Sequence, residues 1–265
     1  MTNNGQIDDE LIIKDDGFIR VLQMNRPQRR NALSESLKMQ MMNAVLDAEE
    51  DEGIRVLIIT GTGNDAFCAG ADLKNMHQND QAGIAFRTPM RRLERNLFEV
   101  VYETKKPTIA AINGSAVAGG FELALACNLR VTHQGALFGL PEAKIGMGAN
   151  FGSVVLPRLI GITHALEMLL TGEYISAARA NELGLINRLV TQDQVLEEAL
   201  KLARQIANNA PISVRRVKAV ALQGLNMPVA AALRQDPGMN PYLSEDRQEG
   251  IAARLEKRTP IWKNR

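Results

Sequence analysis

Two glutamates stand in sequence surroundings that are unusual for a carboxylate. Glu122 falls one turn into an otherwise apolar helix candidate, FELALACN, and Glu142 follows Pro141 in a glycine-bounded loop after a strand candidate. Burying a carboxylate in apolar surroundings is costly without a partner or a purpose, and it raises the pKa. Two such groups at one pocket could serve as general acid and general base. Taken alone, Glu142 fits an exposed loop acid or a cap more readily.

Small residues follow several of the predicted strands, where open α/β sheets place their sites. Gly119 and Gly120 also begin the helix of Glu122, and the unpaired amides and dipole of a helix start favour negative charge. Two amides aimed at one point would form an oxyanion hole. AVAGG could equally make only a tight turn. The informative segments are FCAGADLKNM (67–76), NGSAVAGGFELALACN (113–128) and FGLPEAKIG (138–146).

One glycine pattern imitates a dinucleotide site. GTGNDA (61–66) follows a strand candidate and matches G-x-G-x-x-A. That fingerprint requires a helix that starts at the glycines and meets a pyrophosphate. The next residues, FCAG, begin a helix poorly, so a strand-to-loop turn explains the glycines better.

The composition bounds the classes of function. The chain has 265 residues and a formal net charge of +1, which gives no reason to expect nucleic acid or an anionic membrane as a partner. Cys68 and Cys127 are too few for a disulfide framework. His77, His133 and His164 have no partners at metal-ligand spacing, so we expect no metal site.

The polar, acidic N-terminus lacks the pattern of a signal peptide, and no apolar run approaches the ~18 residues of a membrane span. We therefore expect a soluble protein of the cytoplasm.

The elements that would position these residues alternate between strand and helix, which predicts an α/β fold. Beyond residue 151 helices dominate, so we divide the chain into a core, 1–200, and a helical C-terminal region, 201–265. The predicted elements are a hairpin at 11–24, a helix after the N-cap Ser34 to Gly53, buried strands at 55–61 and 106–112, a long amphipathic helix from Ile84 to Glu103, short strands at 129–133 and 135–140, and a strand near 185–190.

Together the segments resemble the crotonase superfamily, the enoyl-CoA hydratase/isomerase family. AGADL, AGGFELALAC and FGLPEAKIG occur in the family's order, and the similarity extends from NRPQRRNALS to EKRTPIWKNR. The resemblance implies a core built as a spiral of ββα turns and a helical C-terminal region that forms a homotrimer or a dimer of trimers.

The resemblance also implies roles. The amides of Ala71 and Gly119 would hold the thioester carbonyl and stabilise an enolate. Glu122 would help activate water for attack at the β-carbon, and Glu142 would govern the proton delivered to the α-carbon. Because relatives with other chemistry often keep one carboxylate, having both favours an enoyl-CoA hydratase over an isomerase. CoA is part of the substrate, and no further cofactor is implied.

The substrate-binding residues follow from the same resemblance. Arg29 and Arg30 would border the CoA nucleotide and contact phosphate, and Lys74 lies beside the oxyanion loop. Ala69 and Gly120 neighbour the two oxyanion residues and complete the expected CoA and acyl contacts.

One departure from the hydratase pattern bears on the substrate. GMGANFGS replaces a proline-glycine run, so Phe151 could narrow the acyl pocket and Asn150 could bind a polar acyl group. An enoyl-CoA isomerase or a hydratase-lyase for a substituted acyl group is the alternative. RNA binding, known on this scaffold, is disfavoured because the helix at 35–51 has only Lys38 against five acidic residues.

Overall fold

The computed structural model describes residues 9–85 and 93–265. Within these residues the larger sheet has six strands in the order β1-β2-β3-β5-β7-β10. β1 and β2 form the predicted antiparallel hairpin, and the other neighbours pair in parallel. The strands are β1 (Leu11–Asp16), β2 (Ile19–Met24), β3 (Val56–Gly61), β5 (Thr108–Ile112), β7 (Leu129–His133) and β10 (Arg188–Val190).

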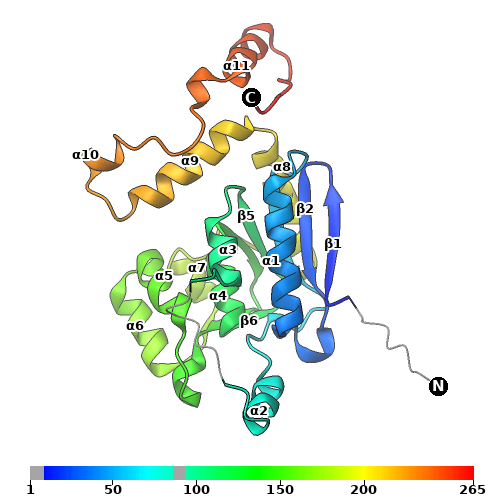
Figure 1. Cartoon of the computed structure of the whole chain (residues 1–265), viewed down its shortest axis with the longest axis vertical. Helices are drawn as coiled ribbons and strands as arrows, with labels where there is room; N and C mark the ends of the chain where they lie inside the picture. Colours follow the sequence, from blue (N-terminus) through cyan, green and yellow to red (C-terminus); the bar gives the residue numbers. More distant parts are fainter. Residues whose placement is uncertain (1–8, 86–92) are drawn as a thin grey trace, which may run out of the picture.

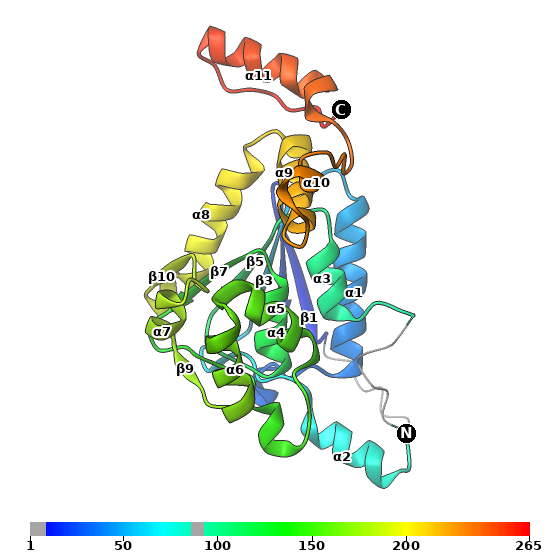
Figure 2. The same ribbon diagram turned by 90° about the vertical axis from the view of Figure 1, so that its left-hand side faces the viewer.

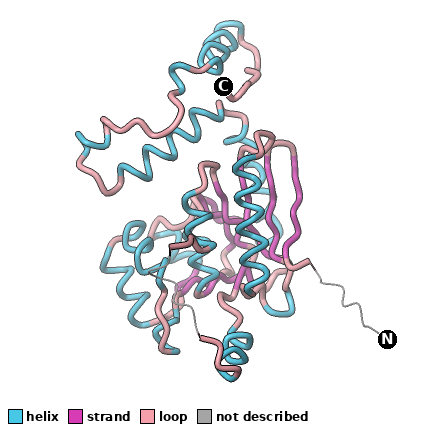
Figure 3. Tube along the Cα trace, viewed as in Figure 1, coloured by secondary structure: helices cyan, strands magenta, loops and turns pink. Residues whose placement is uncertain are grey.

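A smaller sheet lies beside the first, and Figure 3 shows the strands in magenta from the centre of the molecule to the hairpin at its right-hand edge. In the described residues its order is β4-β6-β8-β9, with β4 (Ala66–Cys68), β6 (Ser115–Val117), β8 (Leu137–Gly139) and β9 (Ile175–Ser176). β3, β5 and β7 each lead into a strand of this second sheet and then into helical structure. The chain therefore advances as a spiral of ββα turns, and the predicted α/β fold is confirmed.

The central strands β3 and β5 of the larger sheet are buried on both faces, which explains why they are apolar. Along β3, Val56 and Ile58 contact the cluster that contains α8 (Val195–Ala207), whereas Leu57 and Ile59 contact the cluster that contains α1 (Glu35–Glu50). Figure 2 shows α8 on one side of the sheet and α1 with α3 (Leu97–Glu103) on the other. This alternation is the two-residue period of a strand.

The helices before the site depend on side-chain caps. Ser34 accepts a hydrogen bond from the Leu37 amide and starts α1 as predicted, although the helix ends at Glu50. Asp72 caps α2 (Leu73–Gln81), a helix that we did not predict. The long helix predicted from Ile84 to Glu103 is wrong before Leu97, whereas its last residues form α3 and end at Glu103 as predicted. Residues 84–85 and 93–96 are not helical, 86–92 lie outside the described residues, and Asn96 forms a capping box that starts α3.

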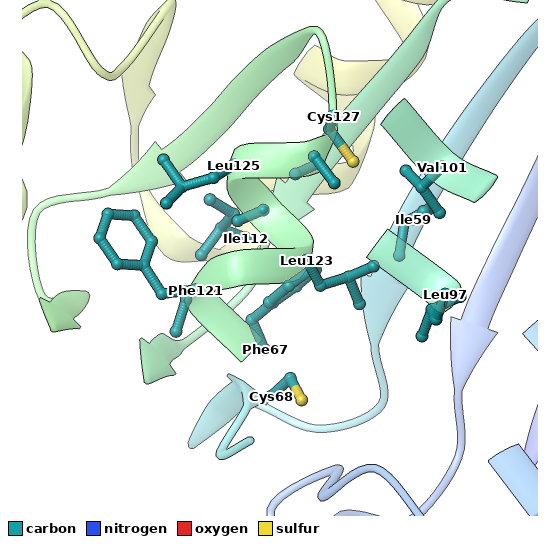
Figure 4. Close-up of a cluster of buried hydrophobic side chains, with 14 of the residues drawn as sticks. Ile59, Phe67, Cys68, Leu97, Val101, Ile112, Phe121, Leu123, Leu125 and Cys127 are labelled. Atoms are coloured by element: carbon teal, nitrogen blue, oxygen red, sulfur yellow. The ribbon is translucent and has the colours of Figure 1, made fainter. Parts of the chain in front are cut away.

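Helix α4 (Gly119–Ala126) lies at the centre of the core. Figure 4 shows Phe121, Leu123 and Leu125 of α4 among buried side chains from β4 and α3. A Cβ on Gly120 would lie 2.0 Å from the carbonyl oxygen of Cys68 in β4. Only glycine therefore permits this approach of the helix to the strand.

The chain continues through helices that cover the smaller sheet and then leave it. Figure 1 shows α9 to α11 extending from one end of the molecule, opposite α2. The remaining helices are η1 (Pro27–Arg29), η2 (Pro141–Ile145), α5 (Asn150–Ile160), α6 (Ile162–Thr171), α7 (Ala177–Glu182), η3 (Gln192–Gln194), α9 (Pro211–Gly224), α10 (Val229–Ala232), η4 (Pro241–Leu243) and α11 (Glu245–Glu256).

The division at residue 200 stays a prediction, and that residue lies within α8, which contacts the larger sheet. Among the described residues, no helix is both long and apolar enough to cross a bilayer.

The contact between α4 and β4 predicts a contrast between neighbouring glycines. Gly120→Ala must displace the Cys68 carbonyl, so its free energy of unfolding should fall by at least about 3 kcal/mol. A Cβ on Gly119 would meet the Phe98 ring at an ordinary 3.5 Å, so Gly119→Ala should remain within about 0.5 kcal/mol of the wild type. Urea denaturation measures both, and equal stabilities would contradict this packing.

Candidate active site

The candidate site residues come from loops and helix starts that the two sheets bring together. The segment after β4 carries Ala69 and Ala71, and the segment after β6 becomes the first turn of α4. Gly70 joins these segments. A Cβ on Gly70 would lie 2.8 Å from the Cβ of Ala118 and 3.0 Å from the amide nitrogen of Gly119. The two predicted oxyanion segments are therefore in direct contact.

The amides of Ala71 and Gly119 are available to a ligand. Among residues 9–85 and 93–265, neither amide donates to a backbone or side-chain acceptor. Both residues are partly exposed, whereas Gly70 and Gly120 are buried. Unpaired N–H groups beside a helix start suit the stabilisation of a negative oxygen.

Ala118 has the backbone conformation that makes this turn possible. Its φ is +52° and its ψ is −131°, a region that costs a non-glycine residue on the order of 1–3 kcal/mol. Its amide donates to the Gly139 carbonyl, and its carbonyl accepts from the amides of Phe121 and Glu122. These bonds hold the strained residue and leave the Gly119 amide unpaired. Strain of this kind is concentrated at functional sites.

Glu122 is buried in the first turn of α4, with 6% of its surface exposed. The Gly152 amide of α5 donates to its Oε1 at 2.8 Å. Burial raises the pKa of Glu122 to about 7, and the charge of Glu142 adds to the rise, against hydrogen bonds from the Gly152 and Phe151 amides. The carboxyl group can therefore accept or release a proton near neutral pH.

Glu142 lies in η2 and is equally buried. Burial raises the pKa of this carboxyl group as well. Its Oε2 has no hydrogen-bond partner among the described residues, which is unusual for a buried polar atom. Because the charge of Glu142 acts on Glu122, the two acids belong to one electrostatic site. An exposed loop acid does not describe Glu142.

The residues predicted to meet CoA lie on the exposed rim. Arg29 ends η1, and Arg30 follows it with a φ of +50°; both side chains are exposed. The Arg30 carbonyl accepts from the Ala69 amide at 3.0 Å, which joins this loop to the oxyanion segment. Lys74 is exposed in the first turn of α2. Their contacts with CoA stay predictions.

Asn150 and Phe151 begin α5, directly before Gly152. The Asn150 side chain donates to the Gly148 carbonyl at 3.0 Å. The Phe151 ring lies 5.8 Å from the rings of Phe98 and Tyr102, so it belongs to an aromatic wall shared with α3. Contacts of these side chains and of Gly120 with substrate stay predictions.

Some residues of the site carried no sequence signal that we used. The Gly152 amide binds Glu122 only because α5 begins there. Phe98 lies close to Gly119 because α3 starts at Leu97. The longer helix predicted from Ile84 lacked this start, so it did not show which way Phe98 points. The start of α3 could have been predicted from the apolar residues around Phe98 and from Asn96 and Glu99, whose spacing is that of a capping box.

The described residues contain no group of three or more His, Cys, Asp or Glu side chains that could hold a metal ion. His133 is buried at the end of β7, and its Nδ1 accepts from the Gly135 amide at 3.2 Å. Burial lowers the pKa of His133, as in a neutral structural histidine.

Comparison with known proteins follows the same features. A model of the enoyl-CoA hydratase/isomerase family matches residues 15–265. A 2,3-dehydroadipyl-CoA hydratase of Escherichia coli is 38% identical over 260 residues, which cover 97% of this chain and 99% of that protein. A crotonyl-CoA hydratase of Syntrophomonas wolfei is 35% identical over 253 residues, 94% of this chain and 96% of that protein.

The fold also agrees with that of a solved relative. The crystal structure of an enoyl-CoA hydratase from Bacillus anthracis matches with a TM-score of 0.87 at 35% identity, over 97% of this chain and 100% of that chain. The resemblance inferred from the motifs is confirmed by the family model, the relatives and the structure. This chain belongs to the enoyl-CoA hydratase/isomerase family, the crotonase family of acyl-CoA enzymes.

Proposed function

We propose that the protein is an enoyl-CoA hydratase, which adds water reversibly to a trans-2-enoyl-CoA and gives a 3-hydroxyacyl-CoA. The observation that carries the proposal is that two buried carboxyl groups, Glu122 and Glu142, lie close enough for the charge of Glu142 to raise the pKa of Glu122, in a chain whose oxyanion segments hold two unpaired amides. An isomerisation needs one group that moves a proton and no attacking water. A second buried acid with an unpartnered oxygen is expected where a water must also be held.

The amides of Ala71 and Gly119 would bind the thioester carbonyl oxygen. Negative charge grows on that oxygen as the enolate forms, so the two N–H groups stabilise the transition state more than the substrate. Removal of one such donor typically costs about 10²–10³ in kcat. This donor pair makes addition at the β-carbon possible, because it accepts the electrons that the attack displaces.

One water supplies both groups that are added. Glu122 accepts a proton as the water oxygen bonds to the β-carbon, and Glu142 governs the proton that reaches the α-carbon. The pKa of Glu122, about 7, suits proton transfer near neutral pH, and burial raises the pKa of Glu142 as well. The water contributes a hydroxyl group and a proton overall, and both acids return to their starting states once the proton taken by Glu122 replaces the one delivered to the α-carbon at Glu142.

The rim and the aromatic wall suit the two ends of a CoA thioester. Arg29, Arg30 and Lys74 would contact CoA phosphates. Phe98 lies against the Gly119 backbone, so an acyl chain that leaves the oxyanion site would meet it and Phe151. Both rings are apolar, which favours a hydrocarbon acyl chain over a charged one.

Loss of the α,β-unsaturated thioester absorbance with crotonyl-CoA tests the proposal. We expect rapid loss and a product whose mass is that of 3-hydroxybutyryl-CoA. Longer and branched enoyl-CoAs would then define the pocket. Tight binding of CoA esters without hydration of any of them would contradict the proposal and favour a sibling reaction of the family.

Each catalytic acid has a defined test. Glu122→Gln and Glu142→Gln should each lower turnover by at least ~10²-fold and leave binding of a saturated acyl-CoA intact. Glu173→Gln is a matched control, since Glu173 is exposed and pairs with Lys144. Steady-state kinetics and calorimetry provide the measurements. Near-normal turnover in either acid variant would refute the assignment of both acids.

Glu122 should also make stability depend on pH. Its pKa is about 7 in the fold against an ordinary 4.5, so folding favours the protonated acid. The associated stability is complete below pH 4.5 and is lost as the pH rises through 7, by on the order of 3 kcal/mol. The Tm of Glu122→Gln, relative to the wild type, should therefore rise between pH 4.5 and about 8. A difference that does not change with pH would contradict the raised pKa.

We also propose that the C-terminal region assembles copies of the chain into a trimer or a dimer of trimers. Large apolar side chains are exposed on this region, which favours burial against another copy. They include Val217, Leu225, Leu233, Leu243 and Leu255. Sedimentation equilibrium should give three or six times the 29.1 kDa chain mass, and a monomer at micromolar concentration would contradict the proposal.

A further inference from the structure

Arg26 lies three residues before Arg29 and four before Arg30, both exposed, yet most of its own side chain is covered by the protein. Only 14% of the side chain is exposed. Its Nε lies 2.7 Å from Glu10 Oε1 in an ion pair, its Nη1 donates to the Ala32 carbonyl at 2.5 Å, and its Nη2 donates to Asp72 at 3.0 Å. Because each nitrogen has an acceptor, Arg26 is not free to bind a CoA phosphate as its exposed neighbours Arg29 and Arg30 are.

Two of these acceptors, Ala32 and Asp72, belong to two chain segments that lie side by side, and the second segment carries the oxyanion amide of Ala71. Residues 30–33 run parallel to residues 69–71, with hydrogen bonds from the Ala69 amide to the Arg30 carbonyl and from the Leu33 amide to the Gly70 carbonyl at 2.8 Å. Ala32 precedes the end of one segment, and Asp72 directly follows Ala71 in the other. Arg26 therefore connects the two segments at the end where Ala71 lies.

Asp72 has a second bond that fixes the peptide after Ala71. Its carboxylate caps α2 by accepting from the Asn75 amide, while its other oxygen holds Arg26. Burial alone would raise the pKa of Asp72, but the hydrogen bonds from Arg26 and Asn75 and the charges of Arg26 and Arg29 outweigh it and lower the pKa. The Asp72 carboxylate can therefore bind Arg26 and Asn75 at once, and the rotation of Asp72 is limited from two directions.

On its other side, the oxyanion segment is packed too closely to move. Gly70 is packed directly against Ala118 and the Gly119 amide. A shift of the Ala71 peptide would therefore change the angle between the two donors, and a displacement near 1 Å can cost on the order of 10² in rate.

We propose that Arg26 is a positioning residue for the reaction, whose ion pair with Asp72 holds the Ala71 amide in line with the Gly119 amide. The inference rests on the proposed function of these amides as the oxyanion donors. Arg26 acts through Asp72 and contacts no substrate atom.

The test compares Arg26→Gln, Asp72→Asn and the double variant. Asparagine is a good helix N-cap, so Asp72→Asn removes the ion pair while it keeps α2. Arg20→Gln is the matched control, because Arg20 is 15% exposed and also pairs with two carboxylates, Asp15 and Asp51, in the hairpin and after α1. Arg20 has no contact with the oxyanion segment in the described residues.

Two readouts separate positioning from general stability. Each single variant should lower kcat about tenfold or more, with the double variant no worse than the single variants, because they break the same contact. In isotope-edited infrared spectra of bound [1-¹³C]butyryl-CoA, the thioester carbonyl band should move back toward its frequency in water. Arg20→Gln should change neither.

The outcomes distinguish this inference from the proposed function. Unchanged kcat and an unchanged carbonyl band in Arg26→Gln and Asp72→Asn would overturn the positioning role, as would additive losses that track the loss of Tm. If the wild type hydrates no enoyl-CoA, the proposed function fails, but the carbonyl band still reads the two amides. A wild-type band at the frequency of the free thioester in water would overturn both.

Discussion

The contact between the 69–71 segment and the first turn of α4 constrains the rest of the structure. Gly70 and Gly120 allow the backbones to approach so closely that any Cβ would overlap with a carbonyl, an amide or a methyl group. The approach requires small residues in both segments and the strained φ of Ala118. As a result, two amides from elements far apart in sequence lie close together, and neither donates to an acceptor among the described residues. The ββα spiral brings β4 and β6 side by side, so the topology makes this contact possible.

The electrostatics follow from this packing. Because α4 begins at the oxyanion segment and lies in the core, Glu122 in its first turn is buried among apolar side chains. The Gly152 amide offsets part of the cost of burying the carboxylate, and the remaining cost appears as a raised pKa. Burial of this carboxylate lowers the free energy of unfolding at neutral pH, and it provides an acid that titrates near neutral pH. The same reasoning explains Arg26, because a half-buried cation with three acidic or carbonyl partners is favourable where it fixes a geometry.

The sequence predicted much of this arrangement, because its signals are local. Buried strands, the Ser34 cap and the isolated acid in FELALACN each depend on neighbours in sequence. The helix expected from Ile84 to Glu103 failed because amphipathic spacing does not say where a helix starts, whereas the Asn96 cap does. Helix α2 has no buried residue, so hydrophobic periodicity did not predict it. The Gly152 amide and the Phe98 ring reach the site through tertiary packing, which periodicity does not reveal.

The central claim is that the two acids add one water across an enoyl thioester held by two amides. Mass analysis of the product from trans-2-hexenoyl-CoA, formed in D₂O enriched in ¹⁸O, tests it most directly. The account predicts a 3-hydroxyacyl-CoA with one ¹⁸O on the β-carbon and one deuterium on the α-carbon. A product with a shifted double bond, carrying deuterium and no ¹⁸O, would contradict hydration and show that the acids only move protons.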